Sequence, residues 1–127
     1  MTASTSPAVL LLGGAGGIGT AVARRLVASG TRVFLVGRSE APLAALGTEL
    51  GVSFQVADLT TFDAVDGAFA AAAEAIGPLT GVANLVGSIV LKPAHLTREE
   101  EYHATIAQNL TTAFATVRAA ARAMPNG

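Results

Sequence analysis

A glycine-rich stretch, residues 12–19, lies between two runs of contrasting pattern. Before it, the apolar residues Ala8 to Leu12 favour a short β-strand, and after it, Ile18 to Ser29 favour a helix. Without β-carbons, the backbone N–H groups of such a loop can close on a pyrophosphate, while the following helix directs its positive N-terminal end at the anion. The stretch therefore predicts a loop that binds the phosphates of a dinucleotide, built on Gly13, Gly14, Gly16, Gly17 and Gly19.

The same alternation of strand-like and helix-like runs continues along the chain, with Gly, Pro, Ser or Thr at each change. Short, almost continuously apolar strands are typical of parallel sheets, whose two faces are both covered by helices. We therefore expect an α/β fold, a Rossmann-type doubly wound parallel sheet with the strand order 3-2-1-4. Its four strands are predicted at residues 8–12, 32–36, 52–56 and 81–86, each buried on both faces.

Two of the helices are predicted in detail. The last helix is the longest: Thr97 and Glu100 form a capping box at its start, and Pro125 and Gly127 end it. Its predicted buried side consists of Tyr102, Ile106, Asn109, Ala113, Val117, Ala120 and Met124. The helix before it is predicted to pack through a stripe formed by Phe62, Val65, Phe69, Ala73 and Ile76.

Length and composition bound the function classes. The 127 residues, 51% of them hydrophobic, suffice for one domain, predicted over residues 8–127 after a disordered leader, residues 1–7. Eight basic and nine acidic residues leave a net charge of −1, which argues against a nucleic-acid partner. The absence of cysteine excludes disulfides and thiol catalysis. The sequence shows neither a signal peptide nor a membrane span, so we expect a cytoplasmic location.

The glycine loop resembles that of the short-chain dehydrogenase/reductase family. Its pattern Thr-Gly-x-x-x-Gly-Ile-Gly is matched at residues 12–19, except that Leu12 replaces the threonine. The loop also fits the Gly-x-x-Gly-x-x-Gly spacing of the family's extended branch, so it leaves both branches open. The resemblance implies that the loop contacts a nicotinamide dinucleotide through Gly13, Ala15, Gly16, Gly17, Ile18 and Gly19.

The residues after the second predicted strand bear on which dinucleotide is bound. An acidic residue there would accept hydrogen bonds from the ribose hydroxyls and repel a 2′-phosphate, whereas this chain has Gly37, Arg38 and Ser39. A guanidinium suits a phosphate, and the Ser39 hydroxyl can add a hydrogen bond. The resemblance therefore favours NADP(H) over NAD(H). In the alternative, Arg38 is a solvated loop charge and Ser39 only caps the next helix.

Two further segments resemble the family's cofactor contacts. Asp58 and Leu59 follow the third predicted strand, where the family flanks the adenine; in the alternative, Asp58 is a turn residue before a helix capped by Thr60. After the fourth strand, residues 84–87 partly match the classical pattern Asn-Asn-Ala-Gly, with Leu85 replacing the second asparagine. The residues expected near the nicotinamide ribose are Asn84, Val86 and Gly87.

The family's proton relay is matched at one residue, Asn109, which resembles the asparagine that helps to hold the relay water. In the alternative, Asn109 is a structural residue whose buried amide is satisfied by hydrogen bonds to the backbone. The serine and the Tyr-x-x-x-Lys motif that the chemistry requires are not matched. The single tyrosine, Tyr102, is followed four positions later by Ile106, and the single lysine is Lys92. No metal site is expected, because the two histidines, His95 and His103, have no third ligand at a suitable spacing.

The resemblance reaches about the N-terminal half of an ordinary family member, so the predicted sheet is incomplete and two hypotheses remain open. In the first, the chain is the cofactor-binding half of an oxidoreductase that transfers hydride between NADP(H) and a small carbonyl or alcohol substrate. In the second, it is a non-catalytic dinucleotide-binding or interaction module, or an inactive fragment. The fourth strand is expected to be an apolar, unpaired edge, which predicts a homo-oligomer or a complementing fragment.

Overall fold

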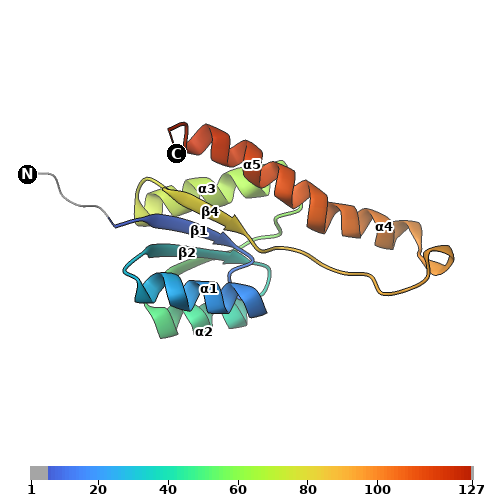
Figure 1. The fold of residues 1–127 in the computed structure, drawn as a ribbon, viewed down its shortest axis with the longest axis horizontal. Helices are drawn as coiled ribbons and strands as arrows, with labels where there is room; N and C mark the ends of the chain where they lie inside the picture. Colours follow the sequence, from blue (N-terminus) through green and yellow to red (C-terminus); the bar gives the residue numbers. More distant parts are fainter. Residues whose placement is uncertain (1–5, 127) are drawn as a thin grey trace, which may run out of the picture.

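The computed structural model describes residues 6–126 and contains a parallel sheet of four strands in the order β3-β2-β1-β4 (Figure 1). The strands are β1 (Ala8–Leu12), β2 (Arg32–Gly37), β3 (Ser53–Val56) and β4 (Gly81–Asn84). The predicted α/β class and strand order are confirmed. β4 ends two residues before its predicted end, and at this end the Asn84 Oδ1 accepts a hydrogen bond from the Val86 N–H at 3.0 Å.

The register of the sheet aligns the carboxyl ends of three neighbouring strands. Leu12 at the end of β1 lies opposite Val36 in β2 and opposite Asn84 in β4. The Leu85 N–H continues the ladder by donating to the Leu12 carbonyl at 2.7 Å. The loops that leave β1, β2 and β4 therefore begin side by side, at the end of the sheet where open α/β folds bind their ligands.

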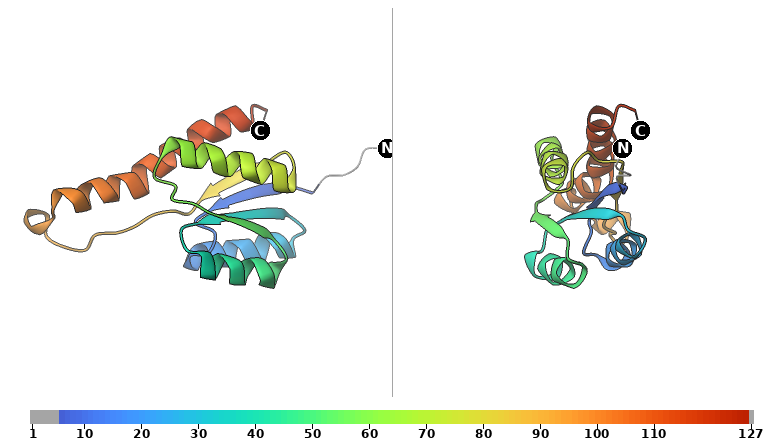
Figure 2. Two further views of the ribbon diagram at one scale, coloured as in Figure 1. Left: turned by 180° about the vertical axis from the view of Figure 1, so that it is seen from behind. Right: turned by 90° about the vertical axis from the view of Figure 1, so that its left-hand side faces the viewer.

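Helices cover both faces of the sheet (Figure 2). α1 (Gly17–Ala28) and α2 (Glu40–Leu50) lie on one face, and α3 (Phe62–Ile76) and α5 (Thr112–Ala123) lie on the other. Because side chains alternate along a strand, β1 and β2 contribute to both cores. The core under α1 and α2 contains Leu11, Val33, Leu35, Leu43 and Leu46. The core under α3 and α5 contains Leu10, Leu12, Phe34, Val36, Val65, Phe69 and Ala115.

The two central strands are buried on both faces, and the two outer strands are not. β1 and β2 are buried almost throughout. β4 is only half-buried, and Val56 in β3 is 45% exposed. β3 and β4 form the two edges of the sheet, so each has a strand neighbour on one side only. The prediction of burial on both faces is therefore wrong for β3 and β4.

α3 packs through a stripe that is shifted from the predicted one. Ala73 is exposed and Phe62 is 40% exposed, so neither belongs to the core. The Phe62 ring instead stacks on Phe114 of α5, with ring centroids 5.8 Å apart, and the Arg118 guanidinium lies 5.0 Å from its centroid. The buried residues of α3 are Val65, Ala68, Phe69 and Ala72.

The last helix is one continuous run interrupted by a π turn. α4 (Glu99–Ile106) passes through η2 (Ala107–Thr111), which has π-helical hydrogen bonding, into α5. Most of α4 projects beyond the carboxyl ends of the strands (Figure 1). The π turn changes the register of the helix and with it the face that α5 directs at the sheet. The buried residues are Thr112, Ala115, Thr116 and Ala119.

The predicted buried side of this helix is therefore largely wrong. Only Ala120 and Met124 of the predicted set are partly buried against the core. Asn109 and Ala113 are exposed. The exposed fractions of Tyr102, Ile106 and Val117 are 57, 38 and 70%.

The start of the helix also differs from the prediction. The capping box of Thr97 and Glu100 is wrong, since the reciprocal contact is made one residue later: the Arg98 N–H donates to Glu101 Oε2 at 2.9 Å. The Thr97 hydroxyl donates to the Pro93 carbonyl instead. A short 3₁₀ turn, η1 (Ala94–Leu96), precedes this cap.

Arg32 connects the beginning of the described chain to the sheet. Its guanidinium donates to the Ser6 carbonyl at 2.9 Å and to the Ile76 carbonyl, and its backbone N–H donates to the Pro7 carbonyl at 2.8 Å. Residues 1–5 of the expected leader lie outside the described residues, as does Gly127, which was expected to end the last helix; α5 ends at Ala123. No helix within residues 6–126 has the length and apolar character needed to cross a membrane.

Candidate functional site

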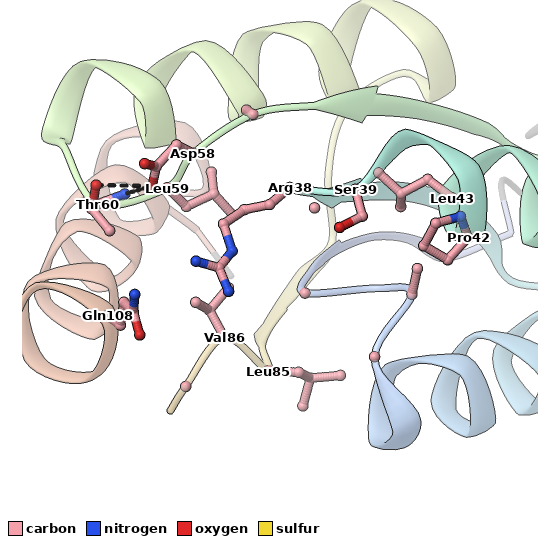
Figure 3. A pocket seen from close by; sticks show the side chains of 16 residues that line it. Arg38, Ser39, Pro42, Leu43, Asp58, Leu59, Thr60, Leu85, Val86 and Gln108 are labelled. Carbon is pink, nitrogen blue, oxygen red and sulfur yellow. Dashed lines mark hydrogen bonds between the residues drawn. The ribbon is translucent and has the colours of Figure 1, made fainter. Parts of the chain in front are cut away.

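A cavity of about 250 Å³ lies at the carboxyl ends of the strands (Figure 3). All four strand ends contribute to it, together with the π turn of the last helix. The β1–α1 loop and the end of β4 supply Gly13, Ala15, Gly16, Leu85, Val86 and Gly87. The end of β2 and the start of α2 supply Gly37, Arg38, Ser39, Pro42 and Leu43. The segment after β3 and the π turn supply Ala57, Asp58, Leu59, Thr60 and Gln108.

The β1–α1 loop is closed onto the end of β2 by its own backbone. Gly13 has a φ of 79°, a left-handed conformation that favours glycine. The N–H groups of Gly13 and Gly14 both donate to the Val36 carbonyl, at 2.8 and 3.2 Å. The first helical turn follows closely, since a β-carbon on Gly19 would lie 2.2 Å from the Gly13 carbonyl oxygen. The loop therefore requires glycine at 13 and at 19 for its shape.

Gly16 and Gly17 are different, because space is open beside them. A β-carbon on Gly16 would have its nearest neighbour at 3.6 Å, and one on Gly17 would meet nothing within 4 Å. Gly17 begins α1, where the first N–H groups of a helix have no partner within the helix. This end of α1 therefore offers unpaired donors and the positive end of a helix dipole beside the cavity.

Arg38 extends from the end of β2 into the cavity, toward Val86 (Figure 3). None of the ion pairs in the described part of the chain involves Arg38. Ser39 occupies the N-cap position of α2, but its hydroxyl makes no capping hydrogen bond. Both side chains therefore remain available to a ligand.

Asp58 forms a turn directly after β3. Its Oδ1 accepts from the Thr60 N–H at 3.2 Å and from the Thr60 hydroxyl at 2.8 Å. The helix that follows is capped by Thr61, whose hydroxyl accepts from the Ala64 N–H at 3.2 Å, so the expected cap at Thr60 is wrong. Asp58 is thus a turn residue, as in the alternative above, and it also lines the cavity. The turn fixes the orientation of its carboxylate.

Asn109 lies in the π turn and bonds to the chain that leaves β4. Its Oδ1 accepts from the Ser88 N–H at 3.1 Å, and its Nδ2 donates to the Ser88 hydroxyl at 3.2 Å and to the Thr105 carbonyl at 2.9 Å. A β-carbon on Gly87 would lie 3.1 Å from the same Oδ1, so glycine allows this approach. Asn109 thus has its hydrogen bonds satisfied, as expected, but at an exposed position and beside the cavity lining.

The structure brings nine of the predicted site residues to the cavity, namely Gly13, Ala15, Gly16, Arg38, Ser39, Asp58, Leu59, Val86 and Gly87. It leaves the other five outside the lining, namely Gly17, Ile18, Gly19, Asn84 and Asn109. Ile18 is 72% exposed. Asn84 instead lines a groove on the other side of β4, against α5.

Several lining residues were missed by the site prediction. Ala57, Thr60 and Leu85 are adjacent in sequence to predicted residues, so adjacency was the available signal for them, whereas Pro42 and Leu43 lie one helical turn after Ser39. Gln108 comes from the π turn, and its position at the cavity depends on a helical register that no sequence pattern marks.

The cavity lining contains binding groups and lacks a proton-transfer pair. Tyr102 is 57% exposed, packs edge-on against His103 and is not among the lining residues. Lys92 also lies outside the lining and pairs with Glu101. Within residues 6–126, no three His, Asp or Glu side chains are grouped so that they could hold a metal ion. The arrangement can hold an anionic ligand against backbone donors and one guanidinium.

Fold and site together define a Rossmann-type nucleotide-binding architecture. The family model described as short chain dehydrogenase matches residues 7–127. The chain therefore belongs to the short-chain dehydrogenase family.

The relatives are reductases and dehydrogenases by name. The chain is 39% identical over 122 residues, 94% of its length and 46% of the relative's, to the 3-oxoacyl-[acyl-carrier-protein] reductase MabA of Mycobacterium bovis. It is 33% identical over 125 residues to the NADP-dependent (R)-specific alcohol dehydrogenase of Lentilactobacillus kefiri, covering 92% of the chain and 48% of that protein. A structure of F189W actinorhodin polyketide ketoreductase with NADPH superposes with a TM-score of 0.87 at 29% identity, covering 97% of this chain and 49% of that one. The chain thus spans about half the length of the relatives it matches.

Proposed function

We propose that this chain binds a nicotinamide dinucleotide in the cavity at the carboxyl ends of the strands and prefers NADP(H) to NAD(H). The observation that carries the proposal is the guanidinium of Arg38, which makes no ion pair within residues 6–126, in one cavity with a glycine-rich loop and the start of a helix. Together these groups offer donors to a pyrophosphate and to a second, separate phosphate.

The pyrophosphate half of the proposal rests on the start of α1. Space is open beside Gly16 and Gly17, so a ligand can approach the backbone there. The N–H groups of Gly17, Ile18 and Gly19 belong to the first turn of α1 and have no helical partner, so these residues contribute donors although their side-chain positions do not line the cavity. The tight packing of Gly19 on Gly13 keeps the helix start close to the loop.

The adenosine half of the proposal rests on the ends of β2 and β3. Arg38 and the free hydroxyl of Ser39 would hold a 2′-phosphate, which supports NADP(H). Asp58, oriented by its turn, would accept a hydrogen bond from the adenine amine, and Leu59 would frame the ring. Val86 and Gly87 would approach the nicotinamide ribose, while Asn84 would act indirectly, by holding the Val86 N–H at the end of β4.

The proposed parent activity is reversible hydride transfer between the nicotinamide and a carbonyl or secondary alcohol, and the bound dinucleotide supplies the hydride. The residues described here bind and orient; the proton that accompanies hydride transfer needs a donor that their cavity lining does not contain. Asn109 would support such a relay by holding polar groups in place at the π turn.

A dinucleotide-binding module without turnover is the second candidate. It is favoured by one observation, the absence of a tyrosine or lysine from the cavity lining among residues 6–126. The two candidates predict the same affinity for NADPH. They differ in whether the chain oxidises NADPH when small ketones are added.

The charge reversal Arg38→Asp tests the NADP(H) preference. Loss of a charge-assisted contact to the 2′-phosphate should weaken NADPH binding about 10- to 100-fold and leave NADH binding within about threefold, measured by titration of nicotinamide fluorescence. The matched control Arg25→Asp makes the same charge change on the exposed surface of α1 and should alter neither affinity. Equal weakening of NADPH by both variants would contradict a local role for Arg38.

A further inference from the structure

A long segment joins the cavity to the start of α4. Residues 88–96, called the strap below, leave the end of β4 and run beyond the sheet before the chain returns as α4 (Figure 1). Its apolar side chains are exposed: Ile89 is 76% and Leu91 85% accessible. Apolar burial therefore does not hold the strap in place, and polar contacts must do so.

The near end of the strap is anchored at the cavity. Ser88 exchanges hydrogen bonds with the Asn109 side chain through its N–H and its hydroxyl, at 3.1 and 3.2 Å. The preceding residue, Gly87, and the residue before Asn109, Gln108, both line the cavity. The position of the near end is thus coupled to the shape of the cavity wall.

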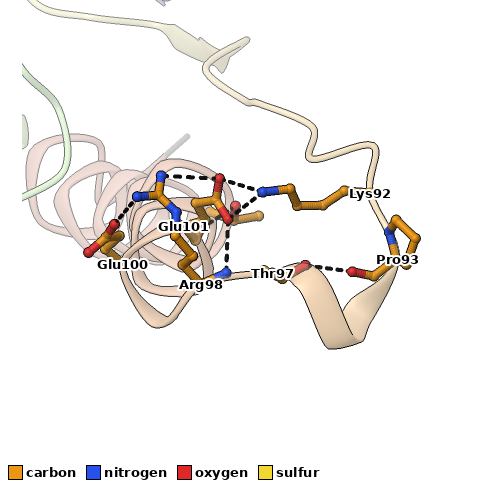
Figure 4. A network of polar contacts seen from close by, with 7 residues as sticks. Lys92, Pro93, Thr97, Arg98, Glu100 and Glu101 are labelled. Carbon is orange, nitrogen blue, oxygen red and sulfur yellow. Dashed lines mark hydrogen bonds and ion pairs between the residues drawn. The ribbon is translucent and has the colours of Figure 1, made fainter.

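The middle of the strap is anchored by one carboxylate (Figure 4). Lys92 Nζ donates to both oxygens of Glu101, at 2.9 Å each. The Arg98 N–H donates to Oε2 at 2.9 Å, and the Arg98 guanidinium donates to Oε1 at 3.4 Å. Three donor groups from the strap and from the start of α4 therefore converge on Glu101.

The environment of this cluster makes it more than a solvated ion pair. The side chains of Lys92 and Glu101 are 34 and 24% exposed, whereas those of the neighbouring pair Arg98–Glu100 are 66 and 70% exposed. The Arg98 N–H and the Lys92 ammonium lower the pKa of the Glu101 carboxyl to about 2. Among the described hydrogen bonds and ion pairs, the Lys92 contact alone links residues 89–92 to a helix.

We propose that Lys92 and Glu101 are positioning residues for the nicotinamide end of the dinucleotide site. Their ion pair fixes the middle of the strap, and the strap in turn holds Gly87 and Ser88 against Asn109 at the cavity wall. The inference rests on the proposed function, since it assigns the strap side of the cavity to the nicotinamide half of the ligand. The nicotinamide side of the cavity, at the end of β4, is thus separate from the adenosine side, where Arg38 follows β2.

The test compares Lys92→Met with the conservative Lys92→Arg, in the full chain, using two probes. NADPH spans both ends of the site, whereas adenosine 2′,5′-bisphosphate occupies only the adenosine end. Lys92→Met should weaken NADPH about three- to tenfold and leave the bisphosphate unchanged, while Lys92→Arg should restore the NADPH affinity. Amide hydrogen exchange should accelerate in Lys92→Met only, at Ser88 and Leu96, two strap residues whose N–H groups donate hydrogen bonds.

The control Glu100→Gln neutralises an acidic residue on the same helical turn that does not contact Lys92, and it should change neither affinity. Equal weakening of both probes by Lys92→Met would show a general effect on the fold and overturn the positioning role, as would unchanged NADPH binding. If the unmodified chain binds the bisphosphate and not NADPH, the strap does not form a nicotinamide site and the inference fails alone. If it binds neither probe, the proposed function fails, and the inference with it.

Discussion

Gly19 and Gly17 stand two positions apart at the start of α1 and differ in what a methyl group would meet. At Gly19 a β-carbon would lie 2.2 Å from the Gly13 carbonyl oxygen, and at Gly17 it would meet nothing within 4 Å. Gly19→Ala should therefore lower the free energy of unfolding by about 3 kcal/mol through overpacking. Gly17→Ala should change it by less than about 1 kcal/mol, with helix propensity favouring alanine. Urea unfolding followed by far-ultraviolet circular dichroism measures both, and similar values for the two variants would contradict the assigned geometry.

The sequence predicted the positions of single site residues best where a residue directly follows a strand. Arg38, Asp58 and Gly87 were predicted at the site because each follows a predicted strand at a place that resembles a cofactor contact of the family, and the structure brings them to one cavity. Asn84 was placed there by the same reasoning but lies outside the lining, because its side chain bonds to the Val86 N–H. A hydrogen bond from the N–H two residues later is a common tendency of asparagine, so the residue type offered a signal that the comparison with the family's cofactor contacts did not use.

The start of α4 gives a prediction at the scale of an element. Because the pKa of Glu101 is lowered to about 2 from a usual value of 4.5, its charged form stabilises the folded chain at neutral pH. This stabilisation is fully present above pH 4.5 and is lost as the pH falls toward 2. The difference in unfolding free energy between the unmodified chain and Glu101→Gln should therefore be constant near neutrality and shrink over that range. Urea titrations at several pH values measure it, and a difference that grows on acidification would contradict the sign.

The same element shows why a helical pattern can mislead. The chain has two apolar faces along residues 102–124, and the sequence prediction chose the one through Ile106 and Val117. The π turn at residues 107–111 directs the other face, with Thr112 and Ala115, at the sheet. A change of register within a helix arises from hydrogen bonding that periodicity does not encode. Strand positions, which depend on short apolar runs, were predicted to within two residues at each end.

At the scale of the whole molecule, the β4 side of the sheet is open. β4 pairs with β1 alone, and a groove beside it is lined by Val82 and Asn84 from β4 and by α5 residues that include Val117. Two more apolar side chains of the last helix are exposed, Phe114 by 60% and Leu110 by 61%. An open strand edge beside apolar side chains favours association, so we expect this chain to form dimers or larger species.

Size-exclusion chromatography with light scattering tests this expectation. Val117→Lys should shift the chain toward monomer, whereas Val56→Lys, an equal change at the opposite edge of the sheet, should not. A monodisperse, stable monomer of the unmodified chain would contradict the expectation. A response to Val56→Lys alone would move the contact to the β3 edge.

NADPH titration of the isotope-labelled chain, followed by amide chemical shifts, tests whether the cavity at the strand ends is a dinucleotide site. We expect saturable shifts at Gly13, Gly16, Arg38 and Gly87, with smaller shifts when NADH replaces NADPH. The absence of shifts, or shifts confined to the groove between β4 and α5, would contradict it.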